Sequence, residues 1–201
     1  MNITTLDMLR QEYAQPKERA VRKEIRALDV HCRRFIGLSP FLILATSDPN
    51  HNMDASPRGG VPGFVKVTAD GVILMPDAPG NNRLDSFANI IATRKVGLLF
   101  LIPGVDETLR VNGSAVLSRA EADIALCTDE RRAPKLAIRV TVEAAYLHCA
   151  KAFMRSKLWD ASAQVGRDAL PTIGQMINDQ AGMQIPPETR EEMARRYAPD
   201  L

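Results

Sequence analysis

A polar turn lies directly before a helical pattern in the segment DAPGNNRLDS, residues 77–86. Asn82 could cap a helix that begins at Arg83, with Asp85 in the position of a capping-box acid. A helix N-terminus also leaves backbone N–H groups unpaired and carries a partial positive charge, and arginine adds a planar fork for phosphate oxygens. The segment therefore predicts either a plain helix cap or an anion site.

A second polar segment, ASPRGGVPG at residues 55–63, lies between two strand-like runs. It places Ser56, Arg58 and Gly59 among further glycines and prolines. Exposed backbone N–H groups, a hydroxyl and a guanidinium suit a ligand with polar edges. The alternative is a β-bulge or a wide turn without a ligand.

The third segment is HCAKAFMRSKLW, residues 148–159. Lys151 and Arg155 are four residues apart and share a helix face, and Trp159 continues the same line. Two cations and an indole on one helix suit an anionic aromatic ligand. The alternative is a solvated basic face with Trp159 as a core anchor.

Other chemistries have little support in the sequence. Histidine and cysteine are adjacent at His31-Cys32 and at His148-Cys149, but neighbours on a helix point about 100° apart and rarely share a metal. The sequence contains no GxSxG, GxGxxG or GxxxxGK[ST] motif. We therefore expect no metal site, no nucleophile elbow, and no Rossmann or P-loop nucleotide site.

The elements that would position these segments change in character along the chain. Helical spacing extends over residues 6–36, with a break near Pro16, and strand-like runs follow from Phe41. Asp70-Gly71 marks a hairpin between two of these runs. The predicted strands are FLILATS, MDASPRG, FVKVTA, VILMPD, VGLLFLI, TLRVNGSAVL and KLAIRVTVEAAYLH, and the later helices are RLDSFANIIATRK, AEADIALC, HCAKAFMRSKLWD and PETREEMARRYA.

This order predicts an α+β fold, with an antiparallel barrel or strongly bent sheet and flanking helices. We expect one domain over residues 1–201. It comprises a helical segment at about 1–38, the barrel at about 41–148 and a second helical segment at about 149–201.

The composition is that of an ordinary globular protein. The 201 residues are 45% hydrophobic and 25% charged, and the net charge of +2 argues against a nucleic-acid or membrane surface. The N-terminal residues lack an apolar signal core, and the apolar run VGLLFLIP is far too short to span a bilayer. Three cysteines without CxxC spacing indicate reduced thiols and a cytoplasmic protein.

Taken together, the polar segments form a familiar series. The run SPRGG…PGF…VILMPDAPGNNRLDSFANIIATRKVGLLFLIPG…ETLRVNGSA, followed by HCAKAFMRSKLW, resembles the pyridoxamine 5′-phosphate oxidase-related FMN-binding proteins. It is most similar to a bacterial subgroup assigned as FMN-dependent enzymes. The resemblance covers roughly residues 41–159, and the shared order of the motifs is more specific than any single motif.

The resemblance implies a split-barrel fold, a homodimer and two FMN sites at the subunit interface. Asn82 and Arg83 fall where the family contacts the FMN phosphate, and the stretch from Ser56 to Gly59 falls beside the flavin. Other positions would approach FMN from the partner subunit or lie near the same interface. The residues assigned to the cofactor in this way are Ser56, Arg58, Gly59, Asn82, Arg83, Thr108, Arg110, Lys151, Arg155 and Trp159.

A flavin site needs cations for the phosphate, an apolar wall for the ring and polar groups at the ring edge. A dimer would also bury VGLLFLIP on both sides, so that this strand need not alternate. The expected function is FMN-dependent oxidation or reduction of a small molecule, with NAD(P)H or a deazaflavin as electron donor. No side chain is an obvious general acid or base, and the catalytic residues stay unassigned.

The chain departs from authentic pyridoxamine phosphate oxidases in one respect. Those enzymes carry a C-terminal Arg-Leu-x-Pro segment that helps to hold the substrate, whereas this sequence ends RRYAPDL. We therefore do not expect vitamin B6 oxidation. The alternatives are a non-enzymatic FMN or haem binder on the same barrel, and a basic interaction module, which the small net charge disfavours.

Overall fold

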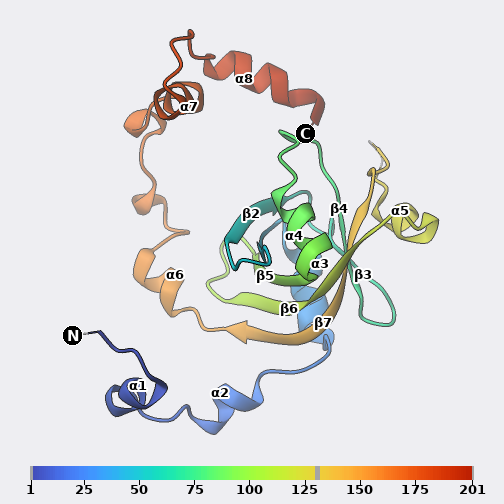
Figure 1. The fold of residues 1–201 in the computed structure, drawn as a ribbon, viewed down its shortest axis with the longest axis vertical. Coiled ribbons are helices and arrows are strands. Elements are labelled where there is room, and N and C mark those ends of the chain that lie inside the picture. Colours follow the sequence, from blue (N-terminus) through green and yellow to red (C-terminus); the bar gives the residue numbers. More distant parts are fainter. Residues whose placement is uncertain (1, 130–131, 201) are drawn as a thin grey trace.

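The computed structural model describes residues 2–129 and 132–200 (Figure 1). Its strands are β1 (Phe41–Ser47), β2 (Met53–Gly59), β3 (Lys66–Val67), β4 (Ile73–Pro76), β5 (Lys95–Leu101), β6 (Thr108–Ser118) and β7 (Ala137–His148). The α-helices are α1 (Leu6–Glu12), α2 (Glu18–Arg22), α3 (Val30–Leu38), α4 (Asp85–Thr93), α5 (Glu121–Cys127), α6 (Lys151–Ser156), α7 (Ile173–Ala181) and α8 (Arg190–Tyr197). Short 3-10 turns cover Ala161–Ala163, Arg167–Ala169 and Ala198–Asp200.

The strands form one antiparallel sheet in the order β2-β1-β5-β6-β7-β4-β3, which curls around a central core (Figure 1). A register shift in the β6–β7 pair lies between Asn112 and Gly113. A side chain at Gly113 would collide with the carbonyl oxygen of Thr141, so only glycine fits this point. The sheet and its helices confirm the predicted α+β class and the curled antiparallel barrel.

Alternation along the neighbouring strands β1 and β5 builds part of the core. Leu42 and Leu44 of β1 and Leu98 and Phe100 of β5 point inward and are fully or almost fully buried. Helices cover the inside of the curl: α3 contributes Cys32 and Ile36, and α4 contributes Phe87 and Ile90. Asp29 positions α3, because its carboxylate accepts a hydrogen bond from the backbone N–H of Cys32 at 2.7 Å.

The predicted break near Pro16 in the helical segment 6–36 is confirmed, because α1 ends at Glu12 and α2 begins at Glu18. The helix predicted from there to residue 36 is wrong, because residues 23–29 separate α2 from α3. Ile25 lies between α2 and α3 and exchanges two backbone hydrogen bonds with Ala145, at 3.0 and 2.8 Å. This bridge to β7 replaces the helical hydrogen bonds that the spacing predicts. The Asp70-Gly71 hairpin is confirmed, with Gly71 at φ +87° between β3 and β4.

The C-terminal segment is more structured than the sequence pattern predicts. Besides the predicted α8, it contains α7, which Thr172 caps through its hydroxyl. From the end of β7 the chain runs through α6 and α7 to α8 as an open arc, and its end returns toward the segment before α4 (Figure 1). Cys32 and Cys127 are buried free thiols, and Cys149 is an exposed one. Within residues 2–129 and 132–200, no helix has both the length and the hydrophobicity that a membrane crossing requires.

Candidate functional site

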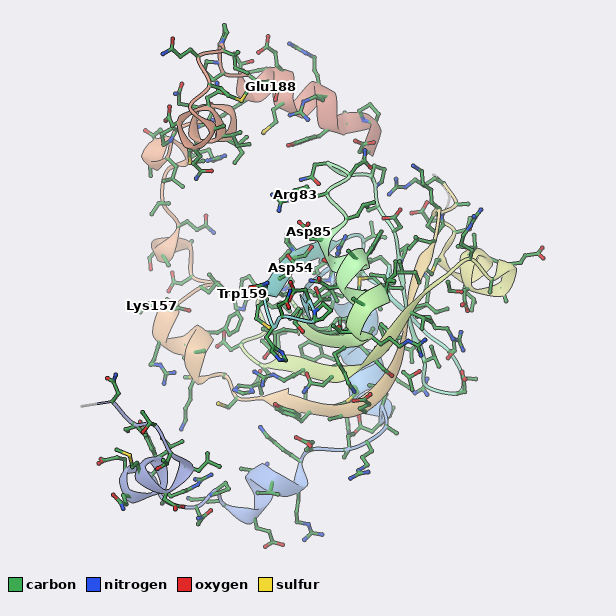
Figure 2. The ribbon with its side chains drawn as sticks, viewed as in Figure 1. Asp54, Arg83, Asp85, Lys157, Trp159 and Glu188 are labelled. Atoms are coloured by element: carbon green, nitrogen blue, oxygen red, sulfur yellow. The ribbon has the colours of Figure 1, made fainter. Side chains whose placement is uncertain are left out.

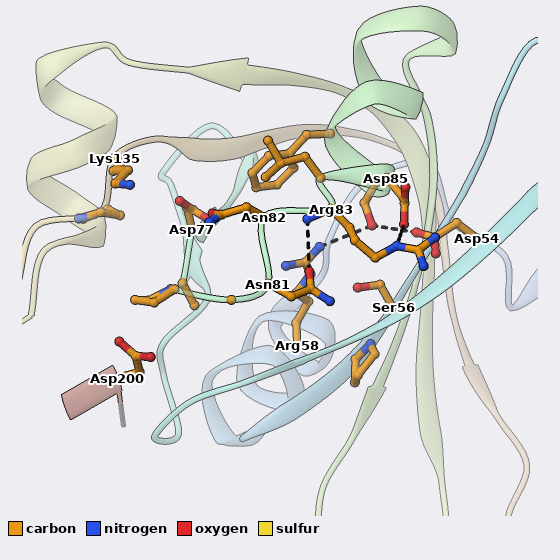
Figure 3. A pocket seen from close by; sticks show the side chains of 18 of the residues that line it. Asp54, Ser56, Arg58, Asp77, Asn81, Asn82, Arg83, Asp85, Lys135 and Asp200 are labelled. Atoms are coloured by element: carbon orange, nitrogen blue, oxygen red, sulfur yellow. Dashed lines mark hydrogen bonds and ion pairs between the residues drawn. The ribbon is translucent and has the colours of Figure 1, made fainter. Parts of the chain in front are cut away.

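A cleft of about 750 Å³ lies between strand β2 and the turn that leads into α4 (Figure 3). Residues 54–58 form one wall and residues 77–87 form the opposite one. Residues 132–135 and Asp200 complete the lining. Two of the three polar segments that the sequence singles out therefore face one another across this cleft.

Arg58 is the least exposed of the described cations that line this cleft. The strand predicted over residues 53–59 is confirmed as β2, and its alternation points Asp54, Ser56 and Arg58 to the same side. In the polar segment at residues 55–63, the part up to Gly59 is therefore strand rather than a loop or a bulge. Arg58 Nη2 donates to Ser86 Oγ at 3.3 Å, and the guanidinium carbon lies 5.7 Å from the centre of the Phe87 ring. Its Nε is buried and has no hydrogen-bond partner among the described residues.

The surroundings of Arg58 act on its pKa in opposite directions. Burial lowers the pKa of the Arg58 guanidinium, while the nearby carboxylates of Asp77 and Asp54 act in the opposite direction. Arginine nevertheless stays protonated in proteins. A half-buried cation with incomplete hydrogen bonding is therefore present at the floor of the cleft, which is an arrangement suited to an anionic ligand.

Ser86 connects the two walls. Its buried hydroxyl donates to Asp54 Oδ2 at 2.6 Å and accepts from Arg58, so that it joins β2 to the first turn of α4. Sequence reasoning missed Asp54, Ser86 and Asp77. The one signal for Asp54 was its position two residues before Ser56 on the same strand face, whereas the contact of Ser86 depends on how α4 packs on β2.

The turn before α4 differs from the predicted cap. Asn82 and Leu84 have φ values of 59° and 60°, in the left-handed region, and α4 begins only at Asp85. Asn82 therefore does not cap a helix at Arg83. Instead, Asn81 Oδ1 accepts a hydrogen bond from the backbone N–H of Arg83 at 3.1 Å.

The left-handed residues before Asp85 prevent α4 from beginning earlier than Asp85. Asp85 is therefore the first residue of the helix, and the predicted capping box is also wrong. The Asp85 carboxylate forms an ion pair with Arg83 Nε at 2.8 Å. The N-cap residue is Leu84, and within the described part of the chain its side chain makes no hydrogen bond to the backbone N–H groups of the first turn of α4. A left-handed Leu84 costs roughly 1–2 kcal/mol, and such strain is often found where a loop holds a ligand.

Arg83 lies at the mouth of the cleft and is largely exposed. Figure 2 shows it beside α4, together with Asp85 and Asp54. The ion pair with Asp85 uses only Nε. Among the described residues, the terminal guanidinium nitrogens have no hydrogen-bond acceptor and could bind an oxyanion.

The structure thus brings Ser56, Arg58, Asn82 and Arg83 together. Gly59 ends strand β2 and is not part of the described lining of the cleft. The remaining predicted cofactor residues also lie outside this lining; they are Thr108, Arg110, Lys151, Arg155 and Trp159. Within one chain, the predicted site residues therefore fall into two groups.

The second group lies on β6 and around α6. Thr108 is buried, and exposed Arg110 donates from Nη1 to the hydroxyl of Tyr146 at 2.9 Å. The prediction that Trp159 shares a helix face with Lys151 and Arg155 is wrong, because α6 ends at Ser156 and the next residue is left-handed.

Trp159 instead anchors the chain after α6, on the side of the barrel shown in Figure 2. Its ring stacks on Phe153 with a centroid distance of 5.5 Å, and its Nε1 donates to the carbonyl oxygen of Val105 at 3.0 Å.

A family model described as Pyridoxamine 5′-phosphate oxidase matches residues 28–149, which is more than half of the chain. The chain belongs to this family. The match covers α3, the whole sheet and the lining of the cleft between β2 and α4 except Asp200. Among curated proteins, no significant match to the sequence was found.

Several solved structures are similar to this member of the pyridoxamine 5′-phosphate oxidase family. HupZ from Group A Streptococcus is 15% identical, with 60% of this chain and 93% of that chain covered and a TM-score of 0.49. An FMN-binding protein from Syntrophomonas wolfei is 16% identical over 72% of this chain and 97% of its own, with a TM-score of 0.45. An FAD-binding protein from Mycobacterium smegmatis is 16% identical over 61% of this chain and 98% of its own, with a TM-score of 0.44.

Proposed function

We propose that this chain is an FMN-dependent oxidoreductase that acts on a small molecule in the cytoplasm. Membership of the pyridoxamine 5′-phosphate oxidase family supports a flavin-linked role. The observation that carries the proposal is the cleft, in which the half-buried Arg58 faces the turn at residues 81–84.

The residues of the cleft fit the phosphate group of FMN. Among the described residues, the buried Nε of Arg58 has no hydrogen-bond partner and the terminal N–H groups of Arg83 at the mouth have no acceptor, so both cations can donate to a phosphate. Between them lies the uncapped first turn of α4, whose backbone N–H groups favour an anion. When bound, FMN would supply the capacity for hydride and electron transfer, while this chain binds and orients it.

The second group of predicted residues is the reason that we propose a dimer. Thr108 and Arg110 of one chain would approach the flavin held by the other chain, with Lys151, Arg155 and Trp159 near the same interface. These residues lie outside the described lining of the cleft within a single chain. A homodimer with FMN between the subunits is therefore the arrangement that we propose.

The test is reduction of the bound cofactor by a defined donor. The protein, loaded with FMN, is mixed without oxygen with NADH, NADPH or a reduced deazaflavin, and absorbance near the flavin band is followed. Bleaching by one of these donors, followed by reoxidation on addition of an acceptor, is the expected result. Stoichiometric flavin that no donor reduces would instead favour a flavin-storing protein, and a haem spectrum of the purified protein would overturn both.

A further inference from the structure

A chain of polar contacts lies beneath the cleft, where α4 packs on β1 and β2. The side-chain amide of Asn89 donates to Thr46 Oγ1 at 3.0 Å, and Thr46 Oγ1 lies 3.4 Å from Asp54 Oδ2. From the other side, Ser86 Oγ donates to the same carboxylate oxygen at 2.6 Å. Thr46 and Ser86 are only 2% and 4% exposed, so water has little access to these hydrogen bonds. Asp54 is therefore the acceptor on which the chain of contacts converges.

The direction of the hydrogen bonds at Ser86 follows from its single hydroxyl proton. The short contact with Asp54 uses that proton, because an ionised carboxylate can only accept. The hydroxyl oxygen is then left as an acceptor, and Arg58 Nη2 donates to it at 3.3 Å. The Phe87 ring, 5.7 Å from the guanidinium carbon, attracts the cation but does not select the direction of its N–H groups. Asp54 thus acts through Ser86 on the orientation of Arg58.

A second carboxylate competes for the same cation. In the view of Figure 3, Arg58 lies between Asp54 and Asp77, and all three residues line the cleft. Asp77 is half-buried, and no described residue gives its side chain a hydrogen bond or an ion pair. Burial lowers the pKa of Arg58, and of the two carboxylates that act against burial, Asp77 has the larger effect.

An ion pair between Arg58 and Asp77 would give both side chains a partner, since the buried Nε of Arg58 has none among the described residues. The structure contains no such pair, although both residues are described. The hydrogen bond to Ser86 instead keeps the guanidinium beside the first turn of α4. The structure therefore holds Arg58 away from the carboxylate that attracts it most strongly.

We propose that Asp54 and Ser86 are positioning residues, which keep Arg58 directed into the cleft and prevent it from pairing with Asp77. The inference rests on the proposed function, in which the charge of Arg58 is available to the FMN phosphate. An arginine already paired with Asp77 would have to leave that partner before it could bind a phosphate, so the affinity of the site would fall. Asp54 and Ser86 have this effect without having to touch the ligand.

The first experiment is a double-mutant cycle on FMN affinity, measured by fluorescence quenching. Ser86→Ala removes the acceptor of Arg58 and should raise the FMN dissociation constant about 10-fold, as loss of a charged hydrogen bond does. Asp77→Asn removes the competing carboxylate, so Ser86→Ala in that background should raise the constant by less than about threefold. Asp54→Ala should behave as Ser86→Ala does in both backgrounds. Asp7→Asn, at an exposed carboxylate on α1, is the matched control background and should leave the effect of Ser86→Ala unchanged.

A purely structural role of Ser86 predicts a different pattern. Ser86→Ala would then weaken FMN binding equally in the wild-type and Asp77→Asn backgrounds, and this additivity would overturn the proposal. Recovery of affinity by Asp77→Asn does not reflect repair of the fold, because both variants in that comparison lack the Ser86 hydroxyl. Asp54 is partly exposed, so Asp54→Ala supplies the same cycle if the buried Ser86→Ala variant does not fold.

The second experiment needs no flavin. A crystal structure of the apo Ser86→Ala variant should show the Arg58 guanidinium within about 4 Å of the Asp77 carboxylate, which is the distance of an ion pair. An Arg58 side chain that stays in its wild-type position in this variant would overturn the proposal. Absence of FMN binding by the wild-type protein would overturn the proposed function instead, and the apo structure would still decide where Arg58 lies.

Discussion

The substitution Arg58→Met separates binding of the flavin from stability of the fold. Arg58 is half-buried, its Nε has no described partner, and its hydrogen bond to Ser86 is long at 3.3 Å. A buried N–H without a partner costs about 1–3 kcal/mol, so an apolar side chain of similar length should not destabilise the apo protein by more than about 1 kcal/mol. Loss of a charged hydrogen bond to the FMN phosphate should weaken binding by about 1.5–3 kcal/mol, or about 10- to 150-fold.

The assay pairs two measurements on the same samples. Quenching of FMN fluorescence gives the dissociation constant, and urea unfolding of the apo protein gives the free energy of unfolding. Arg119→Met, an exposed arginine outside the described lining of the cleft, is the control and should change neither quantity appreciably. Unchanged FMN affinity together with a loss of more than about 2 kcal/mol in stability would refute the reasoning, because Arg58 would then have a structural role only.

Three further substitutions test the neighbouring parts of the account. Asp85→Asn removes the carboxylate that holds Arg83 Nε, so FMN affinity in the same fluorescence titration should rise by up to about fivefold. Asp29→Ala removes the cap of α3 and should lower the free energy of unfolding by about 1 kcal/mol. A backbone hydrogen bond holds the pKa of Asp29 below its usual 3.8, so the cap stabilises the wild type above that pH and is lost as pH falls through the lowered pKa. Acid titrations of wild type and variant should therefore converge. Gly113→Ala forces a methyl group against the Thr141 carbonyl and should lower the free energy of unfolding by about 2–3 kcal/mol in urea; an unchanged midpoint would contradict this account of the bulge.

Sequence reasoning predicted the sheet well, because its strands carry clear local signals. The run FLILATS forms β1 and the Asp70-Gly71 turn forms the β3–β4 hairpin. The predicted helical spacing failed around Ile25, where hydrogen bonds to Ala145 in a distant strand outweigh local periodicity. Ile25 and Ala145 are 120 positions apart, so the spacing of apolar residues around either of them gives no signal of their contact.

The candidate site was predictable in part for the same reason. The residue types at Arg58 and Arg83, with the glycines and asparagines beside them, indicate an anion site as one of two interpretations, beside a plain cap and a turn without a ligand. The left-handed conformation of Leu84 was not predictable, since leucine disfavours it and only the surrounding structure imposes it. The role of Ser86 depends on the packing of α4 against β2, which brings it to Asp54 from 32 positions away.

The measurement that tests the central claim most directly is a titration of the apo protein with FMN. The account predicts saturable binding of one FMN per chain, with a weaker affinity for riboflavin, because riboflavin lacks the phosphate that Arg58 and the turn before α4 would hold. Equal affinity for FMN and riboflavin would contradict the proposed phosphate site. Absence of binding for both would contradict the flavin proposal itself.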